Sequence, residues 1–359
     1  LVIIPQSLSK MTHVASFMTI TNLAELLNSS QSDYLIYDLG RIVQPIAVTE
    51  FAEICAQQRP YPYPLQHHAW FAVVFWGAQQ PAEPFIWFLK FPLDERGLLN
   101  HLAQQEFIAQ VLALLGQQLT HALTPEQEQQ LQQSPYLFLP AEAKRAAFHA
   151  KLTHHWQHAP SAFYDLAKAE LEQPSAEGWQ QIGLQGIHDV ITRLEPNSST
   201  CQAIANHFAH YPEPLQNAVT EALEHGVPPP LLANQLQQLL PQPTAPAAVR
   251  LNALRALAGC ALQATVYESW EQQLEQASVD ELVIIAARHW PALAHSSPRL
   301  EHYLMQVAKQ NNPALFAGLV RDLLQLPSTR VAALSLLQRN DLPAVLYQAW
   351  QQFIRTHST

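Results

Sequence analysis

The sequence predicts a mainly α-helical protein with an α+β domain at its N-terminus, followed by an α-solenoid-like (HEAT-like) array of short helices. Three observations support this fold class. Two runs of aromatic and β-branched residues, 70–76 and 85–91, lie in the first third of the chain and are typical of strands. From residue 123 onward, apolar residues recur at helical spacing instead. The length of 359 residues is enough for two domains.

Four strands are expected in the N-terminal domain, which we place at residues 19–122. Segments 33–39 and 41–48 lie on either side of Gly40 and predict a hairpin. The two apolar runs form a second hairpin, and their continuous hydrophobicity indicates strands that are covered on both faces. The domain should therefore contain a four-stranded, mostly antiparallel sheet.

Three helices are expected to cover this sheet. Thr21 would cap the first helix, Thr49 would open the second, and residues 98–119 would form the third. Asp94 and Glu95 precede the third helix, where the helix dipole favours negative charge. They are expected to cap it.

Residues 1–18 are expected to be a disordered leader or the product of a start codon assigned too early. Regular patterning begins only near Thr19, so Met11 or Met18 would be the true start. The apolar run at residues 1–5 is too short for a signal-peptide core. No stretch has the roughly 20 apolar residues of a membrane span. We therefore expect a cytoplasmic location without membrane insertion.

The remaining chain should be helical. Residues 123–196 are expected to be connecting helices, the last of them at 175–194, and residues 197–359 a helical-repeat-like domain. Within that domain, helix starts are predicted near Ser198, Glu213, Pro229, Pro246, Ala264, Ser278, Pro298, Pro313, Ser328 and Asp341. Helices this short need neighbours to cover their apolar faces, which favours five stacked antiparallel pairs. A compact, irregular helical domain would give nearly the same pattern.

Composition narrows the possible partners. The formal net charge is −10 at pH 7 and no basic run occurs, so we expect neither nucleic acid nor an anionic membrane surface as a partner. A helical nucleic-acid binder would need a basic stripe along the array. The candidates for such a stripe are Arg250, Arg255, Arg288, Arg321 and Arg330. Cys55, Cys201 and Cys260 are far apart, and we expect them to be buried thiols.

Histidine is abundant, with 17 residues. The structural interpretation is that the histidines are polar residues on the exposed faces of helices. The functional interpretation is that they sense acid. His154 and His158 are four residues apart, and His207 and His210 three apart, which puts each pair on one helix face. Neither pair has a nearby third ligand. We expect no metal and no cofactor.

The proline-rich segment 59–64 and the end of the first strand supply the candidate residues for a binding site. Tyr61, Tyr63 and Trp70 lie in or beside a loop that alternating prolines make stiff, and such rings are favoured binding anchors. Asp38 and Arg41 could line a polar cleft beside them. The alternative is structural: the rings pack onto the sheet and the charged residues cap the hairpin.

Three segments together carry a resemblance to a known family. They are 37–41, 61–76 and 87–94. In these segments the chain resembles a family of uncharacterised proteobacterial proteins, classed only as a domain of unknown function. The resemblance covers most of the chain from about Met18 onward. It implies a bacterial cytoplasmic setting, but no activity, ligand or site.

The preferred hypothesis is a non-enzymatic protein-interaction or scaffold protein that binds another protein. The concave side of the array or the Tyr-Pro loop would supply the surface. The alternative is a hydrolase-type enzyme with a polar site in the N-terminal domain, using His67 or His68 as a base. No nucleophile elbow, phosphate loop or dinucleotide fingerprint supports an enzyme.

Overall fold

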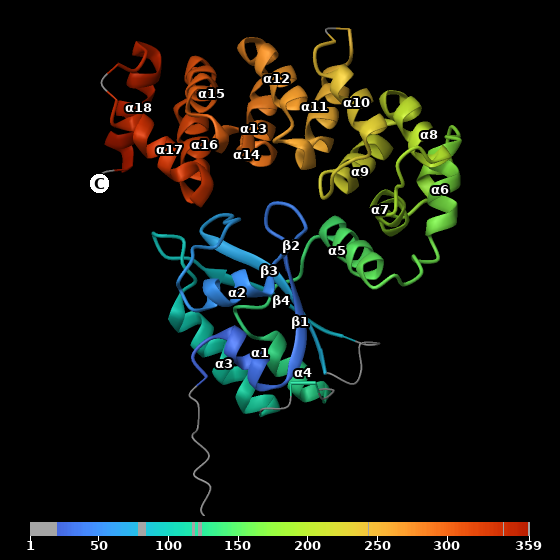
Figure 1. The fold of residues 1–359 in the computed structure, drawn as a ribbon, viewed down its shortest axis with the longest axis vertical. Coiled ribbons are helices and arrows are strands. Elements are labelled where there is room, and N and C mark those ends of the chain that lie inside the picture. Colours follow the sequence, from blue (N-terminus) through green and yellow to red (C-terminus); the bar gives the residue numbers. More distant parts are fainter. Residues whose placement is uncertain are drawn as a thin grey trace, which may run out of the picture.

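The computed structural model describes residues 20–77, 84–116, 119–120, 124–242, 244–339 and 341–357. The predicted leader, residues 1–18, lies outside these segments. A four-stranded sheet with its helices forms one end of the molecule, and a long arc of helices curves around it (Figure 1). Among the described segments we find no helix whose length and hydropathy would suit a bilayer crossing.

The sheet confirms the prediction of four mostly antiparallel strands. Its strands are β1 (Ser32–Asp38), β2 (Gln44–Ile46), β3 (His68–Gly77) and β4 (Phe85–Pro92). They lie in the order β2-β1-β3-β4, and every neighbouring pair is antiparallel. The second strand is shorter than the sequence predicts, because residues 39–43 form a projecting loop instead of continuing the hairpin.

Helices cover both faces of the sheet. Three helices lie on one face: α1 (Leu23–Ser29), α2 (Val48–Cys55) and α3 (His101–Leu115). On the other face, α5 (Glu142–His155) packs its Phe148 against the sheet. Residues of β3 alternate between the two cores: Phe71 belongs to the first and Ala72 to the second. This explains the continuous apolar run in the sequence.

Two predicted caps are wrong. Asn22, not Thr21, caps α1, because its side chain accepts a hydrogen bond from the Glu25 backbone N–H at 3.0 Å. Asn100, not Asp94, caps α3. Asp94 instead closes the turn before that helix, where its carboxylate accepts the Leu98 N–H at 2.8 Å. Nearer asparagines supply both caps, and the sequence places each only a few residues from the predicted residue.

The array consists of the helices from α5 to the C-terminal end, and we call the sheet with α1–α4 the head. The remaining helices are α4 (Pro125–Gln132), α6 (Tyr164–Glu172), α7 (Leu184–Thr192), α8 (Ser199–His207), α9 (Glu213–Leu223), α10 (Pro230–Leu239), α11 (Ala247–Ala256), α12 (Ala264–Gln273), α13 (Val279–Arg288), α14 (Trp290–His295), α15 (Ser297–Lys309), α16 (Pro313–Gln325), α17 (Pro327–Leu337) and α18 (Ala344–His357). Each of the ten predicted starts lies within three residues of an observed one. The likeness to HEAT repeats stays a prediction.

The helices of the array form two layers. The inner layer, which faces the head, runs through α5, α7, α9, α11 and α13, each packed on the next. The outer layer runs through α6, α8, α10 and α12. One continuous hydrophobic core extends from Ala167 to Trp350. The array therefore buries its apolar faces between successive helices, as short helices require.

Two features of the array differ from the sequence analysis. Residues 175–194 are not one helix, because α7 begins only at Leu184, after a 3₁₀ turn at Gly178–Gln181. Gly186 lets α7 approach α6 closely, since a Cβ there would lie 2.5 Å from the Phe163 carbonyl oxygen. The short helix α14 was not predicted, because only His289 separates it from α13 and Pro291 fits its first turn.

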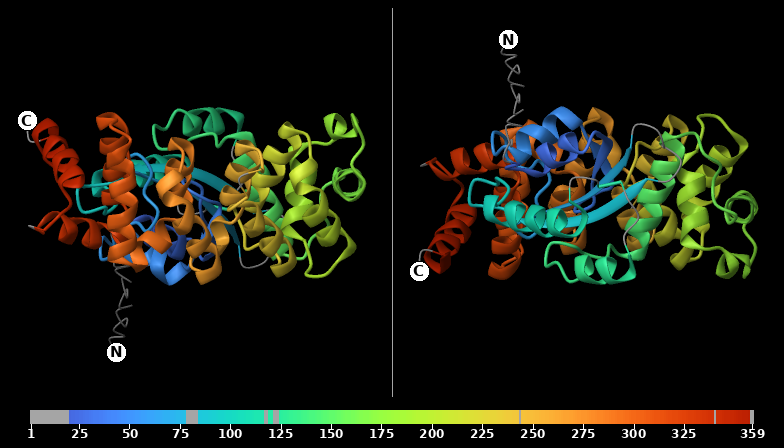
Figure 2. Two further views of the ribbon diagram at one scale, coloured as in Figure 1. Left: turned by 90° about the horizontal axis from the view of Figure 1, so that it is seen from above. Right: turned by 90° about the horizontal axis from the view of Figure 1, so that it is seen from below.

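The arc returns to the head at its far end. Seen from above, helices of the array pass over the sheet (Figure 2). The Arg330 guanidinium donates to the Arg96 carbonyl at 2.9 Å, and the His67 N–H donates to the Gln325 side chain at 3.0 Å. The head is thus held by α5 at one end of the array and by α16–α17 at the other.

Candidate functional site at the junction of head and array

The loop between β1 and β2, residues 39–43, projects from the sheet into the inner layer of the array. Asp38 fixes its start: one carboxylate oxygen accepts the Tyr61 hydroxyl at 2.6 Å and the Gly40 N–H at 3.2 Å. The other oxygen accepts the Arg41 N–H at 3.3 Å. Burial raises the pKa of Asp38 to about 6, although these hydrogen bonds act to lower it.

Arg41 carries the loop's main contact with the array. Its guanidinium forms a bidentate pair with Asp322 of α16, at 3.0 and 2.7 Å. A third bond, from Nε to the Pro64 carbonyl, measures 3.0 Å, and the Trp290 ring lies 5.3 Å from the guanidinium carbon. The Arg41 side chain is only 2 % exposed. One side chain therefore joins the hairpin, the proline-rich loop and two helices of the array.

Asp322→Asn is expected to lower the free energy of unfolding by about 2 kcal/mol, because it leaves the buried Arg41 guanidinium without a counter-charge. Urea unfolding at neutral pH would measure this loss. The matched control is Asp341→Asn, since Asp341 pairs with Arg339 on the surface, where solvent screens the pair, and its loss should leave stability nearly unchanged. Equal losses for both variants would contradict a structural role for the Arg41–Asp322 pair.

The structure brings the five candidate binding residues together, but mostly as buried neighbours. Tyr61 is fully buried, and the Tyr63 ring lies 6.4 Å from it, edge-on. Trp70 is half-buried, with the Lys90 ammonium 4.2 Å from its ring centre. With Asp38 and Arg41, these residues pin the proline-rich loop to the sheet and present the hairpin loop to the array. Their binding of another protein stays a prediction.

A buried carboxylate, missed by sequence reasoning, lies in the inner layer beside the loop. Glu224 is 2 % exposed and accepts hydrogen bonds from Arg255, at 2.6 and 3.0 Å, and from Arg288, at 2.7 and 3.3 Å. Burial by itself raises the pKa of Glu224, but the two guanidinium groups outweigh it and lower that pKa. The sequence separations are 31 and 64 residues, close to one and two helix pairs. This spacing was the signal for the cluster.

Two further side chains hold the loop's backbone. The Lys144 ammonium, on α5, donates to the Arg41 carbonyl at 2.7 Å, and burial lowers its pKa to about 8. His225, which follows α9, accepts the Val43 N–H on Nδ1 at 3.2 Å and must be neutral at that nitrogen. The His188 ring stacks on His225 with centroids 6.1 Å apart. Burial lowers the pKa of both, that of His188 to about 4.

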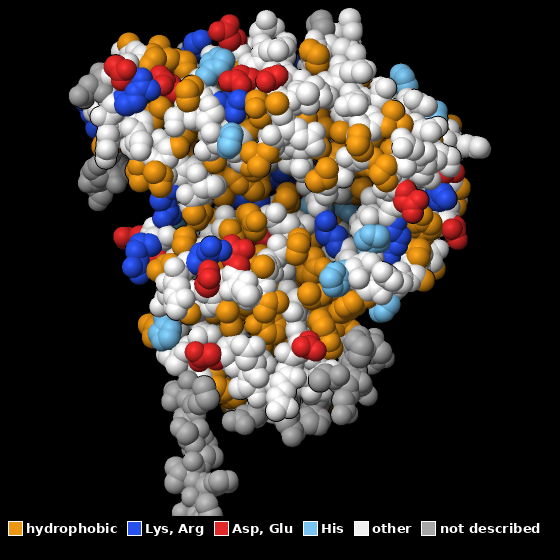
Figure 3. Space-filling model, viewed as in Figure 1, with side chains coloured by type: hydrophobic (Ala, Val, Ile, Leu, Met, Phe, Trp, Pro, Cys, Tyr) orange, Lys and Arg blue, Asp and Glu red, His pale blue; other side chains and the backbone are white. Residues whose placement is uncertain are grey.

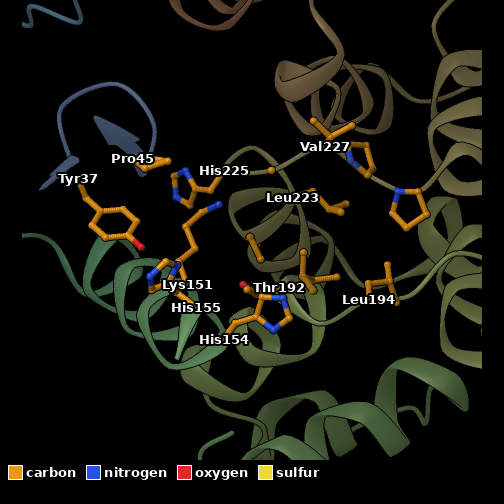
Figure 4. A pocket seen from close by; sticks show the side chains of 15 residues that line it. Tyr37, Pro45, Lys151, His154, His155, Thr192, Leu194, Leu223, His225 and Val227 are labelled. Atoms are coloured by element: carbon orange, nitrogen blue, oxygen red, sulfur yellow. The ribbon is translucent and has the colours of Figure 1, made fainter. Parts of the chain in front are cut away.

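A cavity of about 350 Å³ opens beside this cluster (Figure 4). Tyr37 of β1, Lys151 of α5 and His225 line it, with His154 and His155 at the end of α5. The loop 226–229 forms another wall. That loop packs against residues 258–260, where a Cβ on Gly259 would lie 1.9 Å from the Gly226 carbonyl oxygen, so only glycine fits there. Lys, Arg and His side chains gather along the junction on the face shown in Figure 3.

The residues of the predicted hydrolase site lie away from the cavity beside the hairpin loop. His67, Asp94 and Glu95 line a cavity of about 410 Å³ between the head and α16–α17. No serine, threonine or cysteine is among the described residues that line it. His68 bonds through Nδ1 to the Gln66 carbonyl instead. The arrangement supplies a base but no hydroxyl or thiol nucleophile.

The other candidate sites are a metal site, the cysteines and a basic stripe. In the described part of the chain, no group of three or more His, Cys, Asp or Glu side chains is arranged to hold a metal ion. The three cysteines are buried and unpaired, as predicted. Of the arginines considered for a basic stripe, Arg255 and Arg288 bind Glu224 and Arg250 pairs with Glu281.

The fold and the junction define a class of protein in which an α+β head is clasped by a two-layered helical array. The chain belongs to the family described as protein of unknown function (DUF3549), whose profile matches residues 18–354. This confirms the predicted membership of a family of unknown function. No curated protein and no solved structure gives a significant match to the chain.

Proposed function

We propose that this protein is a non-enzymatic scaffold that binds another protein through the C-terminal end of its array. The observation that carries the proposal is the exposure of large apolar side chains on the last two helices. Tyr347 and Ile354 on α18 are 49 % and 39 % exposed, and Val331 and Leu334 on α17 are also exposed. Tyr347 and Ile354 are two turns apart on one face of α18, and an exposed apolar helix face of this kind marks an interaction surface.

The chemistry of the partner follows from how the array is built. On α18, Leu346 and Trp350 are buried, and the helix packs mainly against α15 and α16. Tyr347 and Ile354 are seven residues apart and lie on a neighbouring side of the same helix. A terminal helix pair needs a polar outer face if nothing is to pack on it. A partner that presents an amphipathic helix would continue the stack.

The hydrolase alternative has less support. The cavity that contains His67 lacks a hydroxyl or thiol nucleophile among its described lining residues. The Asp38 carboxylate accepts from the Arg41 N–H and the Tyr61 hydroxyl, and the Arg41 guanidinium pairs with Asp322. A cytoplasmic location is part of the proposal, and the buried, unpaired cysteines are compatible with a reducing compartment.

The test compares a tagged wild-type chain with Tyr347→Ser/Ile354→Ser, purified from the native host. The matched control is Leu262→Ser, which removes an apolar side chain that is 61 % exposed elsewhere on the array. We expect the wild type and the control to retain the same partner at fixed stoichiometry, and the double variant to lose it. Circular dichroism should show that all three chains are equally helical.

Three outcomes would contradict the proposal. The first is a partner that all three chains retain equally, and the second is the absence of any stoichiometric partner. The third is a dimer in light scattering that only Tyr347→Ser/Ile354→Ser converts to a monomer. That result would assign the surface to a second copy of this chain.

A further inference from the structure

The cavity beside the hairpin loop is lined by basic side chains, although the protein as a whole is acidic. Its ionisable lining groups are Tyr37, Lys151, His154, His155 and His225, and no Asp or Glu is among the described residues that line it. The whole chain, by contrast, has a formal net charge of −10. A concave site with one sign of charge concentrates ligands of the opposite sign.

Lys151 is the strongest indication of a ligand. Within the described residues, no side chain or carbonyl forms a hydrogen bond or ion pair with its ammonium group. The side chain is partly buried, and this burial lowers its pKa. Lys144, two turns earlier on the same helix, has carbonyl partners at 2.7 and 3.4 Å. Because a desolvated cation without a partner is costly, Lys151 is the group that an anion would satisfy.

The donors around the cavity come from both parts of the molecule. Tyr37 belongs to the head, whereas Lys151 and His225 belong to the array, and the three side chains enter the cavity from separate elements (Figure 4). His154 and His155 are exposed at its edge. The volume of about 350 Å³ is at the small end of ligand pockets.

We infer that this cavity binds a small anion through carboxylate or phosphate oxygens. Lys151 is the principal contact, and Tyr37 contributes a contact from the head. Such a ligand bridges the head and the array and stabilises their docked arrangement. The site does not depend on the proposed protein-binding surface, which lies at the opposite end of the array.

Isothermal titration calorimetry on the full chain tests this, with inorganic phosphate and succinate as probes. We expect saturable binding of at least one of them, weakened at least about tenfold by Lys151→Met. Lys309→Met, on the exposed surface of α15, should bind like the wild type. Lys168→Met should also bind normally, because Lys168 lines a neighbouring cavity instead.

Lys151→Met is expected to fold normally, because the ammonium group that it removes has no partner in the described residues. Methionine replaces an ammonium that has no partner, so Lys151→Met should be at least as stable as the wild type in urea. A bound anion should raise the melting temperature of the wild type but not of Lys151→Met. The inference is overturned if neither anion binds saturably up to about 10 mM. It is equally overturned if Lys151→Met binds as the wild type does, or if Lys168→Met loses binding.

Discussion

Glu224→Gln is expected to lower the free energy of unfolding by about 4 kcal/mol, because it leaves the Arg255 and Arg288 guanidinium groups in a partly buried site without a counter-charge. The amide cannot accept from both guanidinium groups with the strength of a carboxylate. Urea unfolding followed by circular dichroism would measure the change.

The matched control for this prediction is one turn earlier on the same helix. Glu221 lies 3.5 Å from Arg255 but is about a third exposed, so Glu221→Gln should cost less than about 1 kcal/mol. If Glu221→Gln and Glu224→Gln destabilise equally, burial is not what makes the Glu224 cluster important.

Acidification from pH 6.5 towards 4 is expected to destabilise the fold through three buried histidines, His188, His225 and His289. Burial lowers the pKa of His188 and His289 from 6.5 to about 4, and that of His225 well below 6.5. In this window the unfolded chain binds more protons, so stability is complete above pH 6.5 and is lost as the pH falls. Each of His188 and His289 contributes on the order of 3 kcal/mol.

Asp38 acts in the opposite direction. Burial raises its pKa from 3.8 to about 6, so in that range the folded chain binds more protons at this site and acidification favours folding. Because three histidines oppose the single Asp38, the net effect of acidification is a loss of stability. The slope of the unfolding free energy against pH should become shallower in His289→Gln. The amide of that variant can still donate to the Leu254 carbonyl, which His289 Nε2 contacts at 2.8 Å.

The measurement is the free energy of unfolding in urea at a series of pH values. His210→Gln, at an exposed position, should leave the slope unchanged. A wild-type chain whose stability is constant between pH 6.5 and 4 would show that these rings do not resist protonation. The many histidines of the sequence would then have no part in sensing acid through the fold.

Local signals explain which elements could be predicted from the sequence. The Ser278–Glu281 capping box forms both of its hydrogen bonds, and Asn312 caps α16 as its position before a proline indicates. The strands were predictable because covering on both faces requires a continuous apolar run. Helix α14 was not, because Pro291 fits the first turn of a helix and interrupts no apolar pattern.

Only part of the site at the junction could be predicted from the sequence, because the residues that contact one another there are distant in the chain. Asp38 and Arg41 stand out at a strand end, but nothing near them in sequence indicates Asp322 or His225. The Glu224 cluster is different, since its members recur at the interval of a helix pair. Charged residues that recur at that interval on the inner helices could have been found without a structure.

The bond between Arg41 and Asp322 spans 281 residues, which has a consequence for the newborn chain. Ribosomes add about 5–20 residues per second, so Asp322 is translated roughly 15 to 60 s after Arg41. Throughout that interval the hairpin tip is solvated and open to chaperones or proteases. The head and the far end of the array can therefore dock only after residue 322 has been made, and chains that end before it cannot form this contact.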